Sequence, residues 1–133
     1  MPSHFATVSG RSYTAFIVDD DEAVRDSLKL LLESHGFEVE AYASTHEFLM
    51  AYRSRPCCCL ILDQNLVDTT GLEFLSSAEW SELQIPVILM TGKGTEALRS
   101  AALRAGASAY FEKPLTGSEF LSAVCSAATT MRS

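Results

Sequence analysis

The sequence predicts an α/β fold with a doubly wound, five-stranded parallel sheet made of five strand–helix units, (βα)5. Short apolar runs, typical of buried strands, alternate with segments whose apolar residues recur every three or four positions, typical of amphipathic helices. The strand segments are apolar on both faces, as in parallel sheets that helices cover on both sides. A length of 133 residues leaves room for one such domain.

The first unit combines a strand at residues 13–18 with a helix at residues 22–35. The strand stops at three consecutive aspartates, of which we expect Asp21 to cap the helix, because aspartate accepts hydrogen bonds from the first helical N–H groups. The helix has one apolar face, and Gly36 is a natural terminator.

Four more units follow in the same order. We expect Trp80 to be a partly buried anchor of the loop before the fourth strand. We assign residues 1–13 to an N-terminal extension, 14–130 to the domain and 131–133 to a C-terminal tail. The remaining strands are expected at residues 37–42, 58–62, 86–90 and 109–111, and the helices at residues 45–52, 71–78, 95–105 and 117–129.

The charge of the chain disfavours direct binding to nucleic acid. Seventeen acidic and ten basic residues give a formal net charge of −7, which leaves little room for a wide basic surface. No apolar run is long enough to span a membrane, and the first residues lack the basic start and apolar stretch of a signal peptide. We therefore expect a cytoplasmic location and no membrane partner.

The cysteines indicate reduced thiols. Cys57, Cys58 and Cys59 are consecutive and Cys125 is distant, a spacing that fits neither a disulfide framework nor a zinc motif. Along a strand, Cys57 and Cys59 point to one face and Cys58 to the other, so the three cannot share a tetrahedral metal site.

Polar residues stand where the predicted strands end. Asp19 and Asp20 follow the first strand, Asp63 follows the third, Thr91 the fourth, and Lys113 the fifth. In open parallel sheets the carboxyl ends of the strands meet at one edge, where ligands bind. Acid, hydroxyl and ammonium groups are therefore expected to converge.

This set of groups favours metal-assisted phosphoryl chemistry. Clustered carboxylates repel one another unless a cation joins them, and oxygen ligands favour Mg²⁺. A nucleophilic carboxylate at Asp63, a metal and the Lys113 ammonium supply what phosphoryl transfer requires, and the Thr91 hydroxyl is placed to bond a phosphoryl oxygen.

The chain resembles the receiver domain of two-component response regulators, and the resemblance covers residues 14–129. Among receivers, it is most similar to those of regulators with a helix-turn-helix output domain. The matching segments are FIVDDDEAVR at residues 16–25, CLILD at 59–63, Gly71, PVILMTG at 86–92 and YFEKP at 110–114.

The resemblance implies the flavodoxin-like strand order 2-1-3-4-5 and a role for each site residue. Asp63 is expected to accept a phosphoryl group, beside Lys113 and with Thr91 and Tyr110 as switch residues. The implied Mg²⁺ ligands are Asp20 directly, Asp19 through water, Asp63, and the backbone carbonyl of Asn65. The peptide between Lys113 and Pro114 is expected to be cis.

The implied partners are a histidine kinase or histidine phosphotransfer protein and an output domain or partner protein. The surface of the fourth helix, fifth strand and fifth helix is expected to change its affinity for the partner, with a phosphorylation-dependent homodimer as one form of output. We expect no enzyme activity beyond self-catalysed phosphoryl transfer and autodephosphorylation.

Two positions depart from the family pattern, and other functions stay open. Val67 replaces a common proline, which favours a more mobile loop at residues 64–70, and Lys93 adds a charge near Thr91. One alternative is a receiver-like interaction module that acts without phosphorylation. Another is a Mg²⁺-dependent phosphatase, although Asn65 stands where such enzymes place a second acid. A flavodoxin-like cofactor binder is disfavoured, because aspartates at the first loop repel phosphate.

Overall fold

The computed structural model describes residues 7–8, 11–115 and 117–130, and its main feature is one five-stranded parallel sheet. The strand order is β4-β3-β5-β6-β7, which is 2-1-3-4-5 when the strands of this sheet are counted along the chain. This order confirms the predicted fold class. The strands are β3 (Thr14–Val18), β4 (Glu38–Tyr42), β5 (Cys58–Asp63), β6 (Val87–Thr91) and β7 (Ala109–Glu112).

Two further strands precede this sheet. β1 (Thr7–Val8) and β2 (Arg11–Ser12) pair antiparallel in a separate two-stranded sheet. They lie in the segment that the sequence assigns to the N-terminal extension, for which no secondary structure is predicted.

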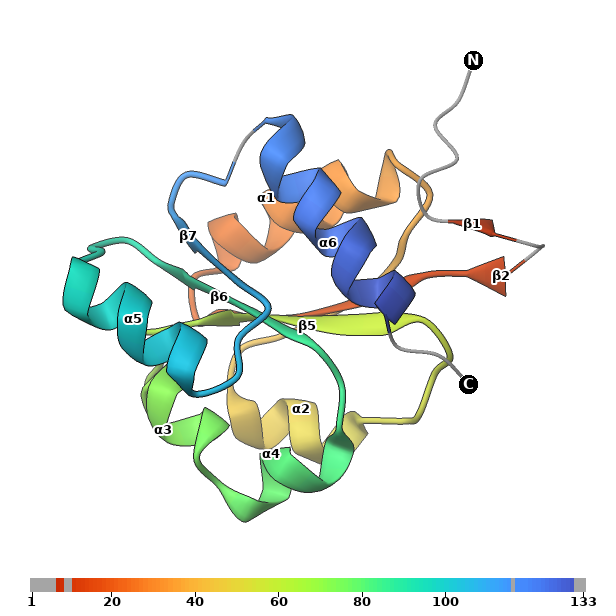
Figure 1. Cartoon of the computed structure of the whole chain (residues 1–133). Coiled ribbons are helices and arrows are strands. Elements are labelled where there is room, and N and C mark those ends of the chain that lie inside the picture. Colours follow the sequence, from red (N-terminus) through yellow and green to blue (C-terminus); the bar gives the residue numbers. More distant parts are fainter. Residues whose placement is uncertain (1–6, 9–10, 116, 131–133) are drawn as a thin grey trace.

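Helices cover both faces of the large sheet (Figure 1). One face carries α1 (Glu22–Glu33) and α6 (Ser118–Thr130), and the other carries α2 (Thr45–Ala51), α3 (Gly71–Leu75), α4 (Ala78–Leu83) and α5 (Glu96–Arg104). None of the helices in the described part of the chain is long and apolar enough to cross a bilayer.

The apolar core has two halves, one on each face of the sheet. Leu32 of α1 and Phe120 of α6 pack in the first half against alternate residues of the central strands. Phe48 of α2 and Phe74 of α3 pack in the second half against the intervening strand residues. β3, β5 and β6 are buried along their whole length, which explains why their sequences are apolar on both faces.

The structure corrects the prediction for residues 71–85. The predicted helix at residues 71–78 ends at Leu75, and a second helix, α4, begins at Ala78 and includes residues 79–83, which were expected to form a loop. The Ser77 side chain caps α4 by accepting a hydrogen bond from the Trp80 N–H at 3.2 Å. Trp80 is buried and packs on Phe74, but it lies on this helix and not on a loop.

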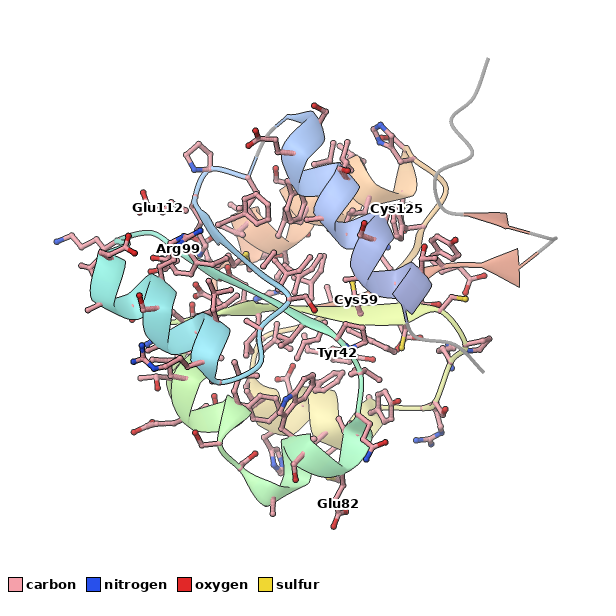
Figure 2. The ribbon with its side chains drawn as sticks, in the orientation of Figure 1. Tyr42, Cys59, Glu82, Arg99, Glu112 and Cys125 are labelled. Atoms are coloured by element: carbon pink, nitrogen blue, oxygen red, sulfur yellow. The ribbon has the colours of Figure 1, made fainter. Side chains whose placement is uncertain are left out.

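The cysteines pack as the sequence predicts. Cys58 lies in the core half beneath α2, whereas Cys59 lies in the half beneath α6. Figure 2 shows Cys59 below the helix that carries Cys125, and the Cys59 thiol lies 4.0 Å from the Val124 carbonyl oxygen. Burial raises the pKa of Cys58 to about 11, so its thiol is protonated at neutral pH.

Candidate functional site

The register of the parallel strands aligns their carboxyl ends. Val18, the last residue of β3, lies opposite Leu62 of β5, so Asp19 and Asp63 follow at neighbouring positions on the same edge. Thr91 ends β6 opposite Glu112 of β7, and the Lys113 N–H donates to the Thr91 carbonyl at 2.8 Å. The sheet therefore brings the predicted site residues to one edge.

Three carboxylates form the centre of this edge. One oxygen from each of Asp19, Asp20 and Asp63 lies within 4.8 Å of the others. Asp19 and Asp63 are buried, whereas Asp20 is exposed. Because water screens the two buried charges poorly, their repulsion is strong unless a cation is near.

Lys113 supplies a positive charge between the two buried carboxylates. Its Nζ lies 2.7 Å from Asp19 Oδ2 and 3.2 Å from Asp63 Oδ1. Burial alone would lower the pKa of Lys113, but hydrogen bonding and attraction to the two aspartates raise it. The side chain therefore stays a cation. Its peptide bond to Pro114 is cis, as the resemblance implies.

The Lys113 ammonium does not fully offset the cost of a buried negative charge at Asp63. Burial, followed by the charge of Asp19, raises the pKa of the Asp63 carboxyl from 3.8 to about 6, against the opposing effect of Lys113. At neutral pH the carboxylate is mostly ionised, so it is available as a nucleophile or as a ligand.

Local hydrogen bonds fix the aspartates after β3. Asp19 Oδ1 accepts a hydrogen bond from the Asp21 N–H at 2.9 Å, and Arg25 Nη1 donates to the Asp19 carbonyl at 2.8 Å. The Asp21 side chain accepts from the Ala23 and Val24 N–H groups and caps α1, as predicted. The first turn of α1 therefore holds the backbone of the acidic segment.

Thr91 is buried at the same edge and bonds within its own loop. Its Oγ1 accepts a hydrogen bond from the Lys93 N–H at 3.2 Å and lies 3.3 Å from the Lys93 carbonyl oxygen. Tyr110 on β7 is half-buried, as expected, and its buried hydroxyl packs against Gly94, where a Cβ atom would collide with it. Both predicted switch residues therefore contact the loop between β6 and α5.

Asn65 lies in the loop after β5 and its side chain is exposed. The backbone N–H of Asn65 is hydrogen-bonded to the Asp63 carboxylate and opposes the rise in the pKa of Asp63. Asn65 also forms an isolated antiparallel bridge with Thr70. The loop between these residues includes Val67, which is 84% exposed.

The carboxylate cluster fits a hard divalent cation. Asp19 Oδ2 is buried and, apart from its ion pair with Lys113, has no hydrogen-bond partner among the described residues. The exposed position of Asp20 leaves an approach from solvent. Carboxylate oxygens with water on one side are the donor set that Mg²⁺ prefers.

Two residues near the site were not identified from the sequence as functional. Arg25 lies six positions after Asp19, a spacing that places it over the strand end once α1 has turned, and this spacing is a usable signal. Asp68 accepts hydrogen bonds from residues of α2 that are 22 and 23 positions away, so no local pattern indicates it.

A family model and the curated relatives of this sequence point to the same protein family. Residues 15–125 match the family model for the response regulator receiver domain. The response regulator protein TodT of Pseudomonas putida is 35% identical over 117 residues, which cover 88% of this chain and 52% of TodT. The transcriptional regulatory protein FixJ of Azorhizobium caulinodans is 35% identical over 113 residues, which cover 85% of this chain and 54% of FixJ.

The structural comparison agrees. The crystal structure of FixJ-N is 31% identical in sequence and superposes with a TM-score of 0.78, covering 92% of this chain and 98% of that chain. This chain spans about half the length of the curated relatives that it matches.

Proposed function

The chain belongs to the response regulator receiver domain family of two-component signalling, and we propose on this basis that Asp63 is its phosphoacceptor. One observation carries the proposal: the Lys113 ammonium lies between the buried carboxylates of Asp19 and Asp63. A carboxylate nucleophile beside a fixed cation is the minimum that phosphoryl transfer from a donor requires.

Each residue has a distinct part in the proposed reaction. A carboxylate oxygen of Asp63 attacks the phosphorus of a phosphohistidine or small acyl phosphate, and the leaving group departs on the opposite side. Lys113 keeps its proton and pairs with the transferred phosphoryl group, which gains an acyl phosphate bond to Asp63. Asp19 then holds the other side of the Lys113 ammonium and keeps it oriented.

Asp19, Asp20, Asp63 and the backbone carbonyl of Asn65 are the proposed ligands of Mg²⁺. Such an ion, when bound, neutralises charge on the phosphoryl oxygens. The close approach of the three carboxylates supports this assignment.

Phosphorylation is proposed to act through Thr91 and Tyr110. The Thr91 hydroxyl leaves its contacts with Lys93 and bonds a phosphoryl oxygen, and Tyr110 follows because it packs on the same loop. The surface of α5, β7 and α6 then changes its affinity for a partner. Such a switch requires that the partner bind the two states with different affinity.

The proposal extends to the partners and the location of the chain. We propose a histidine kinase or histidine phosphotransfer protein as donor, and an output domain, partner protein or second copy as recipient of the signal, in the cytoplasm. The proposed receiver unit is residues 14–130. Among the curated relatives, TodT is named a response regulator protein and TdiR of Thauera aromatica a transcriptional regulatory protein, which supports a signalling role over enzymatic turnover.

Phosphorylation of the purified chain tests the proposal. Incubation with Mg²⁺ and acetyl phosphate is expected to add the mass of one phosphoryl group, and Asp63→Asn is expected to abolish the addition. Asp26→Asn is the matched control, because Asp26 is an exposed carboxylate on α1 outside the site. Unchanged mass of the wild type with acetyl phosphate, phosphoramidate and a kinase donor would favour the interaction module that acts without phosphorylation.

A further inference from the structure

The loop that follows Asp63 is closed at its base by backbone and side-chain hydrogen bonds. The Gly71 N–H donates to the Gln64 carbonyl at 2.8 Å, and the Leu72 N–H donates to Gln64 Oε1 at 3.0 Å. Asn65 and Thr70 bridge within the loop. These contacts return the chain to the end of β5, but they do not reach the tip of the loop.

Asp68 joins the tip of this loop to helix α2. Its Oδ2 accepts a hydrogen bond from the Thr45 hydroxyl at 2.7 Å and another from the His46 N–H at 3.2 Å. Thr45 is buried, so its hydroxyl has little access to water as a substitute partner. The neighbouring Val67 side chain points into solvent and adds no such contact.

The two hydrogen bonds hold Asp68 as a carboxylate. Although burial acts in the opposite direction, hydrogen bonds from Thr45 and from the backbone of His46 lower the pKa of Asp68. The contact therefore persists across the neutral pH range, where an ionised acceptor bonds more strongly than a neutral one.

From this contact we propose that Asp68 is a positioning residue for the site at Asp63, and that it acts through the backbone of Asn65. The inference rests on the proposed function. By fixing the loop tip on α2, Asp68 limits the conformations of residues 64–70, so that the Asn65 carbonyl is held where a cation at Asp63 requires it. Without the contact, binding of Mg²⁺ would have to order the loop, which costs free energy.

The geometry of the contact allows substitutions that distinguish the positioning role of Asp68 from an effect of its negative charge. Both donors meet the same oxygen of Asp68, and an asparagine at this position offers one carbonyl oxygen that accepts both hydrogen bonds. Asp68→Asn therefore removes the charge and keeps the contact, whereas Asp68→Ala removes both. Thr45→Val removes the hydroxyl that donates to Asp68, and valine keeps the shape of the buried threonine side chain.

The test measures the binding of Mg²⁺ by isothermal titration calorimetry, and beside it the rate of phosphorylation by acetyl phosphate as a function of Mg²⁺ concentration. Asp68→Ala is expected to raise the half-saturating Mg²⁺ concentration by about three- to tenfold, the effect of losing contacts of this strength. Asp68→Asn keeps both hydrogen bonds without the charge, so it is expected to raise the half-saturating Mg²⁺ concentration by less than Asp68→Ala does, because neutral hydrogen bonds are weaker than charge-assisted ones. Thr45→Val is also expected to raise the half-saturating Mg²⁺ concentration. The double variant with Asp68→Ala and Thr45→Val is expected to show a smaller free-energy change than the sum of the two single effects, because both substitutions break the same contact.

Three results would overturn the inference while leaving the proposed function intact: a wild-type response in Asp68→Ala, an Asp68→Asn variant as impaired as Asp68→Ala, or additive effects in the double variant. A wild type that is never phosphorylated would instead overturn the proposed function. If Asp68→Ala fails to fold in urea titrations, Thr45→Val still decides the question, because the inference predicts a raised half-saturating Mg²⁺ concentration for this variant and a wild-type value would overturn it.

Discussion

Asp63 Oδ1 lies 3.2 Å from the Lys113 ammonium, yet the Asp63 carboxyl has a pKa of about 6. Burial and the charge of Asp19 therefore outweigh the ion pair. In the unfolded chain the same carboxyl has its ordinary pKa near 3.8. The folded state thus binds this proton more tightly than the unfolded state. Its contribution to stability is fully present below the unfolded pKa and is lost as the pH rises through about 6.

Asp63→Asn is expected to stabilise the metal-free protein at pH 8, because asparagine cannot acquire the unfavourable buried charge. After allowance for solvent screening and the lost ion pair, the expected gain in the free energy of unfolding is about 1–2 kcal/mol. The gain is expected to shrink at a pH well below 6. Urea titrations in EDTA at pH 4.5 and pH 8 measure it. Asp26→Asn serves as the exposed control, and a gain of equal size at both pH values would contradict the assigned cause.

Gly71 is expected to be necessary for the shape of the site. A Cβ atom at this position would lie 2.6 Å from Leu89 Cδ1 and 3.0 Å from the Asp63 carbonyl oxygen. The leucine can move, but the backbone carbonyl of Asp63 cannot move without displacing β5. Gly71→Ala is therefore expected to lower the free energy of unfolding by about 1–3 kcal/mol, the usual cost of overpacking.

Gly92→Ala is the matched control for this substitution. A Cβ atom at Gly92 would have no neighbour within 4 Å, and the stability of this variant is expected to stay within about 0.5 kcal/mol of the wild type. Urea midpoints of the two variants check the prediction. Equal destabilisation would show that loss of glycine, and not the contact with Asp63, is responsible.

The convergence of Asp19, Asp63 and Lys113 was predictable because it follows from topology. Residues that end parallel strands must meet at one edge, and apolar runs mark those strands clearly in the sequence. The contact of Asp68 with Thr45 was not predictable, because it joins a loop to the start of α2 through side chains that no periodicity relates. Helix α4 was missed for a different reason: Ser77 marks its start, but six residues are too few to show a helical period.

The end of helix α4 offers a substitution that is expected to stabilise the fold. Gln84 follows this helix with φ of 56°, a left-handed conformation that favours glycine, and its side chain is exposed. Gln84→Gly is expected to raise the free energy of unfolding by about 0.5–1 kcal/mol, as the strain removed exceeds the added freedom of the unfolded chain. Gln84→Ala keeps the strain and is expected to give no gain. Denaturant midpoints distinguish the two variants, and a similar gain for alanine would show that strain at this position is not the cause.

The hydrogen bonds of the Thr91 hydroxyl allow the proposed switch to be tested separately from the phosphorylation that precedes it. In this structure Thr91 Oγ1 accepts from the Lys93 N–H at 3.2 Å, so the proposed turn of the hydroxyl toward the phosphoryl group must release that N–H. The amide signal of Lys93 in ¹H–¹⁵N spectra is therefore expected to move when Mg²⁺ and beryllofluoride are added to the wild type.

Thr91→Ala lacks the hydroxyl and is expected to give no comparable movement of the Lys93 signal, because the contact is already absent before the ligand binds. Thr91→Ser keeps a hydroxyl at the same carbon and is expected to behave as the wild type does. Since none of these substitutions removes the Asp63 nucleophile, mass spectrometry is expected to find phosphorylated Asp63 in both variants. A wild-type shift of Lys93 in Thr91→Ala would mean that the loop responds to the phosphoryl group by a route that bypasses Thr91, and the assignment of Thr91 as a switch residue would then fail.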